Sequence, residues 1–153
     1  MPTIILKTEI RAPKHLVFDL SRDVDFHQRS TAHTGEKAIA GVTSGLLNKG
    51  DSVTWRAKHL GVWQNLTSQI TEMDSPHRFV DEMVQGAFAS FTHEHLFESS
   101  SSDSEVTIMT DTFEYTSPFG ILGKLVDVLF LKNYMTRLLQ TRNQILKSEA
   151  ENQ

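Results

Sequence analysis

The sequence feature that most constrains the fold is a change in the spacing of apolar residues near residue 120. From residue 36 to residue 115, apolar and polar side chains alternate in six segments, which is typical of strands with one buried face. Beyond the sequence SPFG at 117–120, apolar residues recur at steps of three and four, which is typical of a helix. The helical positions are Leu122, Leu125, Val126, Leu129, Leu138, Leu139, Ile145 and Leu146. The pattern predicts a sheet followed by one long C-terminal helix.

The alternating segments predict seven strands when the N-terminal one is included. In the first strand, Ile4, Leu6, Thr8 and Ile10 share one face, and the sequence APK at 12–14 ends it. The other six strands are predicted at 36–40, 51–59, 62–73, 79–85, 90–97 and 105–115. Short turn sequences separate these segments, including the serine run SSSSDS, which we interpret as a hairpin tip. Short connections favour antiparallel neighbours.

Two short helices are predicted between the first two strands. Pro13 suits the opening of the first helix, and Leu16, Val17 and Leu20 give it an apolar stripe. Asp25 is expected to cap the second helix. The order predicts a single α+β domain over 1–153, in which a curved antiparallel sheet buries one face under the final helix.

Composition excludes several classes of function. The chain has 153 residues and no cysteine, so it can form neither a disulfide nor a thiolate metal site. Its net charge of −4, without a cluster of Lys or Arg, argues against a nucleic-acid partner. The N-terminal sequence lacks the pattern of a signal peptide, and no uncharged stretch is long enough to span a bilayer. We therefore expect a cytoplasmic protein without stable membrane insertion.

Strand periodicity also predicts which side chains point into the fold. On the segment SFTHEHLFES, Phe91, His93, His95 and Phe97 share one face. The same rule places Asp111 and Tyr115 on the inward face of the next strand. The predicted ligand-binding set comprises Trp55, His59, Asp81, Met83, Phe91, His93, His95, Asp111, Phe113 and Tyr115.

Ionisable side chains on an inward face must pair or meet water, because an unpaired buried charge is costly. The set therefore predicts a cavity with polar groups in its wall. Asp111 is expected to pair with His93 or His95, and such a pair either joins two strands or orients a ligand; these interpretations are compatible. A metal site needs at least three converging ligands, which His93, His95 and Asp111 could in principle supply. Same-face side chains on a strand are widely spaced and no further ligand motif is present, so we expect neither a metal nor a cofactor.

Five stretches of the sequence resemble one protein superfamily. They are VFDLSRDVDFHQRS at 17–30, GDSVTWRAKHLG at 50–61, SPHRFVDEMVQGAF at 75–88, FTHEHLFE at 91–98 and DTFEYTSPFGILG at 111–123. Nearly the whole chain is similar to the START/Bet v 1-like superfamily, also called SRPBCC, and within it to the bacterial ligand-binding and cyclase/dehydrase-like group. The resemblance implies the helix-grip fold, in which the sheet wraps around a long C-terminal helix. It also implies a pocket for a small apolar or amphipathic molecule.

Three functions fit this sequence. The first is binding of a small apolar or amphipathic ligand between the sheet and the C-terminal helix. The second is a cyclase or dehydratase in the same pocket, with His93 or His95 as the base and Asp111 fixing its tautomer. The third is an interaction module with a vestigial cavity. The first is our prediction.

Overall fold

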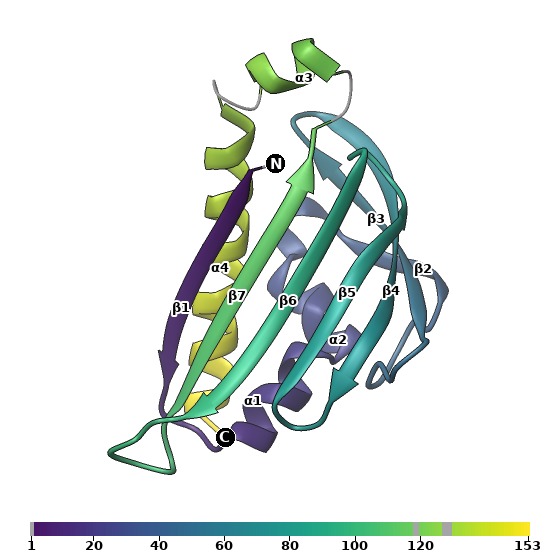
Figure 1. The fold of residues 1–153 in the computed structure, drawn as a ribbon. Helices are drawn as coiled ribbons and strands as arrows, with labels where there is room; N and C mark the ends of the chain where they lie inside the picture. The colour runs from purple at the N-terminus through teal and green to yellow at the C-terminus, as the bar shows by residue number, and fades with distance from the viewer. Residues whose placement is uncertain (1, 118–119, 127–129) are drawn as a thin grey trace.

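The computed structural model describes residues 2–117, 120–126 and 130–153. Its strands are β1 (Thr3–Ile10), β2 (Lys37–Gly41), β3 (Ser52–His59), β4 (Val62–Asp74), β5 (Arg78–Gln85), β6 (Ser90–Ser99) and β7 (Thr107–Thr116). Its helices are α1 (Lys14–Ser21), α2 (Val24–Ser30), the short 3-10 turn η1 (Ala32–Thr34), α3 (Gly120–Val126) and α4 (Lys132–Glu151). Figure 1 shows the arrangement.

The strands form one antiparallel sheet in the order β1-β7-β6-β5-β4-β3-β2. The sheet curves, and α1, α2 and α4 lie on the same side of it (Figure 1). The predicted α+β helix-grip architecture is confirmed, including the hairpin tip at the serine run, where the backbone N–H of Ser100 donates to the carbonyl of Val106 at 2.8 Å.

The prediction of one unbroken C-terminal helix was wrong in its extent. Residues 120–126 form a separate helix, α3, which lies beyond the end of the sheet, and α4 begins only at Lys132 (Figure 1). Leu122 and Leu125 are 71% and 57% exposed on α3, whereas Leu139 and Leu146 are buried on α4. Leu129 and the side chain of Val126 lie outside the described residues. Apolar spacing therefore identified helical residues but not which of them the sheet covers.

The cap of α2 also differs from the expectation. The helix begins at Val24, so the capping residue is Asp23, whose Oδ1 accepts hydrogen bonds from the backbone N–H groups of Asp25 and Phe26 at 2.9 and 3.2 Å. The carboxylate of Asp25 instead accepts a hydrogen bond from the backbone N–H of Gly45 at 3.0 Å. Its role is therefore to hold the loop after β2 against the helix.

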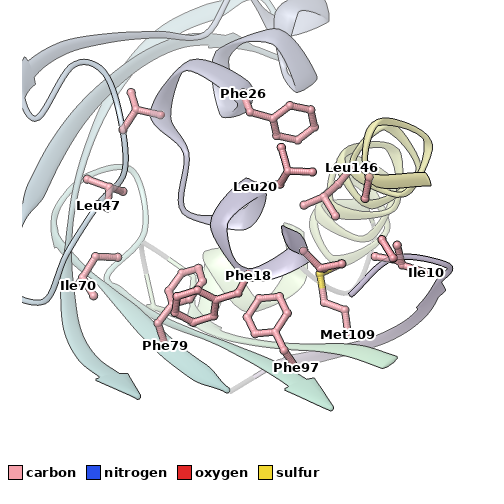
Figure 2. Close-up of a cluster of buried hydrophobic side chains, with 14 of the residues drawn as sticks. Ile10, Phe18, Leu20, Phe26, Leu47, Ile70, Phe79, Phe97, Met109 and Leu146 are labelled. Carbon is pink, nitrogen blue, oxygen red and sulfur yellow. The ribbon is translucent and has the colours of Figure 1, made fainter. Parts of the chain in front are cut away.

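One end of the space between sheet and helices is filled by side chains, and we call it the packed end (Phe18, Phe79, Phe97, Met109 and Leu146). The Phe18 ring meets Phe79 and Phe97 edge to face, with centroids 5.5 and 5.3 Å apart. Figure 2 shows these rings beside Met109 and Leu146, all of them almost fully buried. This part of the core joins α1 and α4 to β5, β6 and β7.

Candidate functional site

The other end of the same space contains a cavity of about 710 Å³. Its walls come from β3 to β7, α2, α3 and α4, and most of the lining is apolar. We call this region the hollow end (Leu66, Phe88, Phe91, Phe113 and Leu139). A volume of this size falls within the range of small-molecule sites, roughly 300–1,000 Å³.

Six of the predicted site residues line the cavity, namely Trp55, His59, Asp81, Phe91, His93 and Phe113. The other four do not line it. His95, Asp111 and Tyr115 are buried behind the wall, and Met83 packs against the apolar side chains there without facing the space. Alternation along a strand predicts which face a side chain lies on, but it does not say where along that face the sheet pulls away from the helix.

Beside the packed end lies a group of ionisable side chains that we call the inner cluster (Asp81, His93, His95 and Asp111). His93 Nε2 lies 3.0 Å from Asp111 Oδ1, and His95 Nε2 lies 2.9 Å from Asp81 Oδ1. His95 Nδ1 is 3.1 Å from the same Asp111 Oδ1, without the alignment of a good hydrogen bond. The expected pairing of Asp111 with a histidine is therefore present for both rings.

Helix α4 completes the inner cluster with two buried polar residues. Asn143 Nδ2 donates to Asp111 Oδ2 at 2.8 Å, and Arg142 Nη1 lies 3.7 Å from Asp111 Oδ1. Arg142 also donates to the carbonyl of Ser21 at 3.2 Å. These contacts link the helix to the middle of the sheet through the carboxylate of Asp111, which is 1% exposed.

Burial and pairing act in opposite directions on the two carboxylates. Burial raises the pKa of Asp111, but the hydrogen bond from His93 and the closeness of the His95 ring outweigh it and hold the pKa well below its usual range. Burial likewise raises the pKa of Asp81, and the hydrogen bond from His95 with nearby positive charge outweighs it, so this pKa is also lowered. Both carboxylates are ionised at neutral pH.

The two histidines respond differently to the same surroundings. Burial lowers the pKa of His93, the charge of His95 lowers it further, and the pKa ends below its usual value. Burial also lowers the pKa of His95, but this ring lies between two carboxylates, whose closeness raises its pKa above the usual value. His95 thus holds its second proton more strongly than His93 does.

Position along β6 separates the histidines in the same way. The ring of His95 stacks on Phe79 of the packed end, with centroids 4.2 Å apart. The ring of His93 meets Phe113 of the hollow end edge-on at 5.3 Å and lines the cavity. His95 therefore packs within the core, whereas His93 lies in the cavity wall.

The inner cluster also has a spacing that could hold a metal ion. One ligand atom from each of Asp81, His93 and His95 lies within 4.8 Å of the others. The charges argue against this use, because the carboxylates are already balanced by His95 and by the neighbouring Arg142. The expectation of no metal stays a prediction.

Two polar contacts elsewhere in the cavity wall form the outer pairs (His27 with Glu36, and His59 with Tyr134). His27 Nε2 lies 2.9 Å from Glu36 Oε1, and its ring lies 4.3 Å from that of Trp55. Burial raises the pKa of Glu36, but the charge and hydrogen bond of His27 outweigh it, and the pKa is lowered.

The second outer pair joins the sheet to the start of α4. His59 Nδ1 and the Tyr134 hydroxyl are 2.6 Å apart. Burial lowers the pKa of His59 and raises that of Tyr134. Both shifts favour the neutral forms, so the contact is a hydrogen bond between two neutral groups, with the tautomer of His59 setting which of them donates.

Several cavity residues were absent from the predicted set, namely Glu36, Phe88, Tyr134 and Arg142. A signal existed for Arg142, because Leu139, Arg142, Asn143 and Leu146 follow the three- and four-residue spacing of a buried helical stripe. Polar residues on such a stripe need partners, and here the partner is Asp111. Glu36 and Tyr134 lie at element ends, where periodicity carries little information.

The fold and cavity together define a helix-grip protein with a ligand-sized space. The sequence model of the family described as polyketide cyclase / dehydrase and lipid transport matches residues 1–151. The chain belongs to this family.

Solved structures with the same fold come from bacteria and plants. A protein from Thermus thermophilus is 18% identical, with a TM-score of 0.73, and the match covers 97% of this chain and 99% of that one. A START superfamily protein from Mycobacterium smegmatis is 10% identical, with a TM-score of 0.74, covering 98% and 97%. Ginseng major latex-like protein 151 from Panax ginseng is 15% identical, with a TM-score of 0.69, covering 97% of each chain.

These similarities confirm the predicted START/Bet v 1-like resemblance, and identities this low show the fold alone. None of the curated proteins compared with the chain matches it in sequence. Among the helices that the structure describes, none combines the length and apolar character needed to cross a membrane.

Proposed function

We propose that this protein binds a small apolar or amphipathic molecule in the cavity at the hollow end. The observation that carries the proposal is the cavity itself, about 710 Å³ with aromatic and aliphatic walls. An apolar ligand that enters this space removes its own surface from water and covers Phe88, Phe91 and Phe113. The family description, which includes lipid transport, supports the same function.

Displacement by a bulky side chain tests the proposal. Ala57 of β3 is 4% exposed and lines the cavity, whereas Ala40 of the neighbouring strand β2 is exposed. We expect Nile red to become fluorescent with the wild type and with Ala40→Trp, and to bind Ala57→Trp about tenfold more weakly because the indole occupies the space. Circular dichroism checks that each variant is folded. Equal dye binding by both tryptophan variants would place the dye elsewhere and contradict the proposal.

The second candidate is an enzyme of the cyclase or dehydratase type, and the orientation of His93 favours it. With Nε2 held by Asp111, His93 Nδ1 is free to take a proton from a carbon between two carbonyl groups. That carbon would then form a bond to another carbonyl carbon of the same substrate molecule. The resulting alkoxide would take up the proton, so no oxidant is needed. Incubation with a linear poly-β-ketone, followed by mass spectrometry, distinguishes the two functions. A ligand recovered unchanged favours binding alone.

A further inference from the structure

His93 is fixed with one ring nitrogen available to the cavity. Its Nε2 lies 3.0 Å from Asp111 Oδ1, and the ionised carboxylate can only accept, so the proton of the neutral ring is on Nε2. Asn143 holds the other oxygen of Asp111 at 2.8 Å, which fixes the carboxylate in turn. Nδ1 of His93 therefore carries a lone pair.

Asp81 places a second acceptor beside the first. Its Oδ1 lies 3.9 Å from His93 Nδ1, which is too long for a direct hydrogen bond, and both residues line the cavity. Neither atom has a proton to give the other. Within the part of the chain that the structure describes, His95 donates to Asp81, but no hydrogen bond is found at Nδ1 of His93. The cavity wall thus presents two neighbouring acceptors, His93 Nδ1 and Asp81 Oδ1, that a single hydrogen-bond donor could satisfy.

Charge balance decides what kind of donor fits. The carboxylates of Asp81 and Asp111 lie 2.9 and 3.1 Å from the two ring nitrogens of His95, and the guanidinium of Arg142 lies 3.7 Å from Asp111, so both carboxylates already have basic partners. A ligand carboxylate at this point would add an uncompensated negative charge, and an ammonium group or a metal ion would add a positive one. Either is costly in a buried site.

We infer that the cavity recognises a neutral hydroxyl group, an alcohol or a phenol, which donates to the acceptor pair formed by His93 Nδ1 and Asp81, and that it selects against carboxylates. This inference rests on the proposed function, because it names the polar group of the ligand that the cavity binds. The apolar part of that ligand lies against Phe91 and Phe113, which share the cavity wall with His93.

Four naphthalene probes of similar size test the inference by calorimetry on the wild type at neutral pH. We expect 2-naphthol to bind about tenfold more tightly than 2-methoxynaphthalene, which has the oxygen but no proton to donate. Naphthalene should bind like 2-methoxynaphthalene. We expect 2-naphthoate to bind about a hundredfold more weakly than 2-naphthol, because its charge has no partner.

Asp81→Asn changes the site with little change in shape. The new amide oxygen can still accept from His95, but the charged acceptor beside His93 Nδ1 is lost, and the balance of charge becomes positive. We expect the tenfold preference for 2-naphthol over 2-methoxynaphthalene to disappear and the discrimination against 2-naphthoate to shrink to a few-fold. Glu82→Gln, the same chemical change at the next position of β5, should keep the wild-type order because Glu82 does not line the cavity.

The outcomes separate this inference from the proposed function. If all four probes bind the wild type with equal affinity, the cavity binds apolar molecules but the inferred hydroxyl selectivity is wrong. If none binds, the proposed function itself fails. Elemental analysis adds a further test: one equivalent of zinc in the purified protein, lost in Asp81→Asn, would show that the inner cluster holds a cation and would overturn the inference.

Discussion

The packed end and the hollow end lie on the same face of one sheet, yet they differ in what covers them. At the packed end, Phe18 of α1 packs edge-on against both Phe79 and Phe97, and α4 adds Leu146 (Figure 2). At the hollow end, the aromatic rings of Phe88, Phe91 and Phe113 pack on one another and leave a space in front of them.

This difference indicates that the packed end supplies most of the stability, whereas the hollow end leaves room for the proposed ligand. Close packing at one end supplies the apolar burial that holds α4 against the sheet, so the other end can remain open without loss of the fold. The inner cluster lies at the boundary, with His95 stacked on the packed end and His93 facing the cavity. Polar anchoring of α4 through Asn143 and Asp111 then fixes the floor of the cavity.

The largest expected effect comes from truncating a ring at the packed end. Phe97 is 1% exposed and touches both Phe18 and Phe79, so Phe97→Ala should reduce the free energy of unfolding by about 4 kcal/mol. Phe91→Ala, on the same face of the same strand, should cost about 2 kcal/mol because its ring already borders open space. Urea denaturation measures both. Equal losses would show that the two ends contribute alike and would remove the proposed division.

Next in size is the loss of the carboxylate that joins the sheet to α4. Asp111→Leu leaves His93 and Asn143 without their partner, and we expect it to reduce the free energy of unfolding by about 3 kcal/mol. Glu114→Leu, at an exposed position of the same strand, should change it by less than about 0.5 kcal/mol. Thermal unfolding of both variants supplies the measurement, and an equally small loss in both would contradict an anchoring role for Asp111.

The residues of the inner cluster show how much of the site the sequence could predict. Alternation along β6 and β7 correctly placed His93, His95 and Asp111 on one buried face, because side chains on a strand alternate whatever the fold. It could not tell that His93 borders a cavity and His95 does not, because that depends on where α4 stands relative to the sheet.

In the C-terminal region, apolar spacing is limited in the same way as a predictor of which side chains are buried. Apolar spacing continues from α3 into α4, but only α4 has a sheet beneath it, so Leu122 is exposed and Leu146 is buried. Periodicity reports that a helix has an apolar face, not what covers the face. The contribution of Arg142 could have been inferred from its place on the buried stripe, whereas the Glu36 and Tyr134 contacts depend on loops whose course the sequence does not specify.

A pH titration should separate the two histidines by the sign of their response. The pKa of His95 is raised, so its stabilising effect is present below the unfolded value of 6.5 and is lost as pH rises through the folded pKa. The pKa of His93 is lowered, so its effect is present above 6.5 and is lost as pH falls. Asp81 and Asp111 are the described charged groups that act on both rings, and Arg142 acts on the two carboxylates.

NMR titration of the imidazole protons should therefore find His95 protonated to a higher pH than His93. Asp111→Asn should lower the pKa of His95, because one of its two carboxylate partners becomes neutral. The same variant should lose less stability than the wild type when the pH falls below about 4, since Asp111, whose pKa is depressed in the folded state, no longer has to be protonated. Unchanged histidine titrations in this variant would show that Asp111 does not set their charge states.

The smallest effect on stability is expected at the hollow end, where the His59–Tyr134 hydrogen bond joins the end of β3 to the start of α4 at 2.6 Å. Helix α4 packs chiefly against β1, α1 and α2, so this hydrogen bond is a separate polar link between α4 and β3 in the cavity wall. Tyr134→Phe should change the free energy of unfolding by about 1 kcal/mol or less, yet speed the dissociation of Nile red about fivefold, because opening the wall no longer breaks a hydrogen bond. Asn133→Ala, at an exposed position of the same turn, is the matched control and should leave the rate unchanged.

His59→Phe should reproduce the effect of Tyr134→Phe, and the double variant should add nothing further, because both changes remove the same hydrogen bond. Stopped-flow fluorescence measures the rates, and dissociation as slow as that of the wild type in both single variants would mean that the ligand leaves by another route.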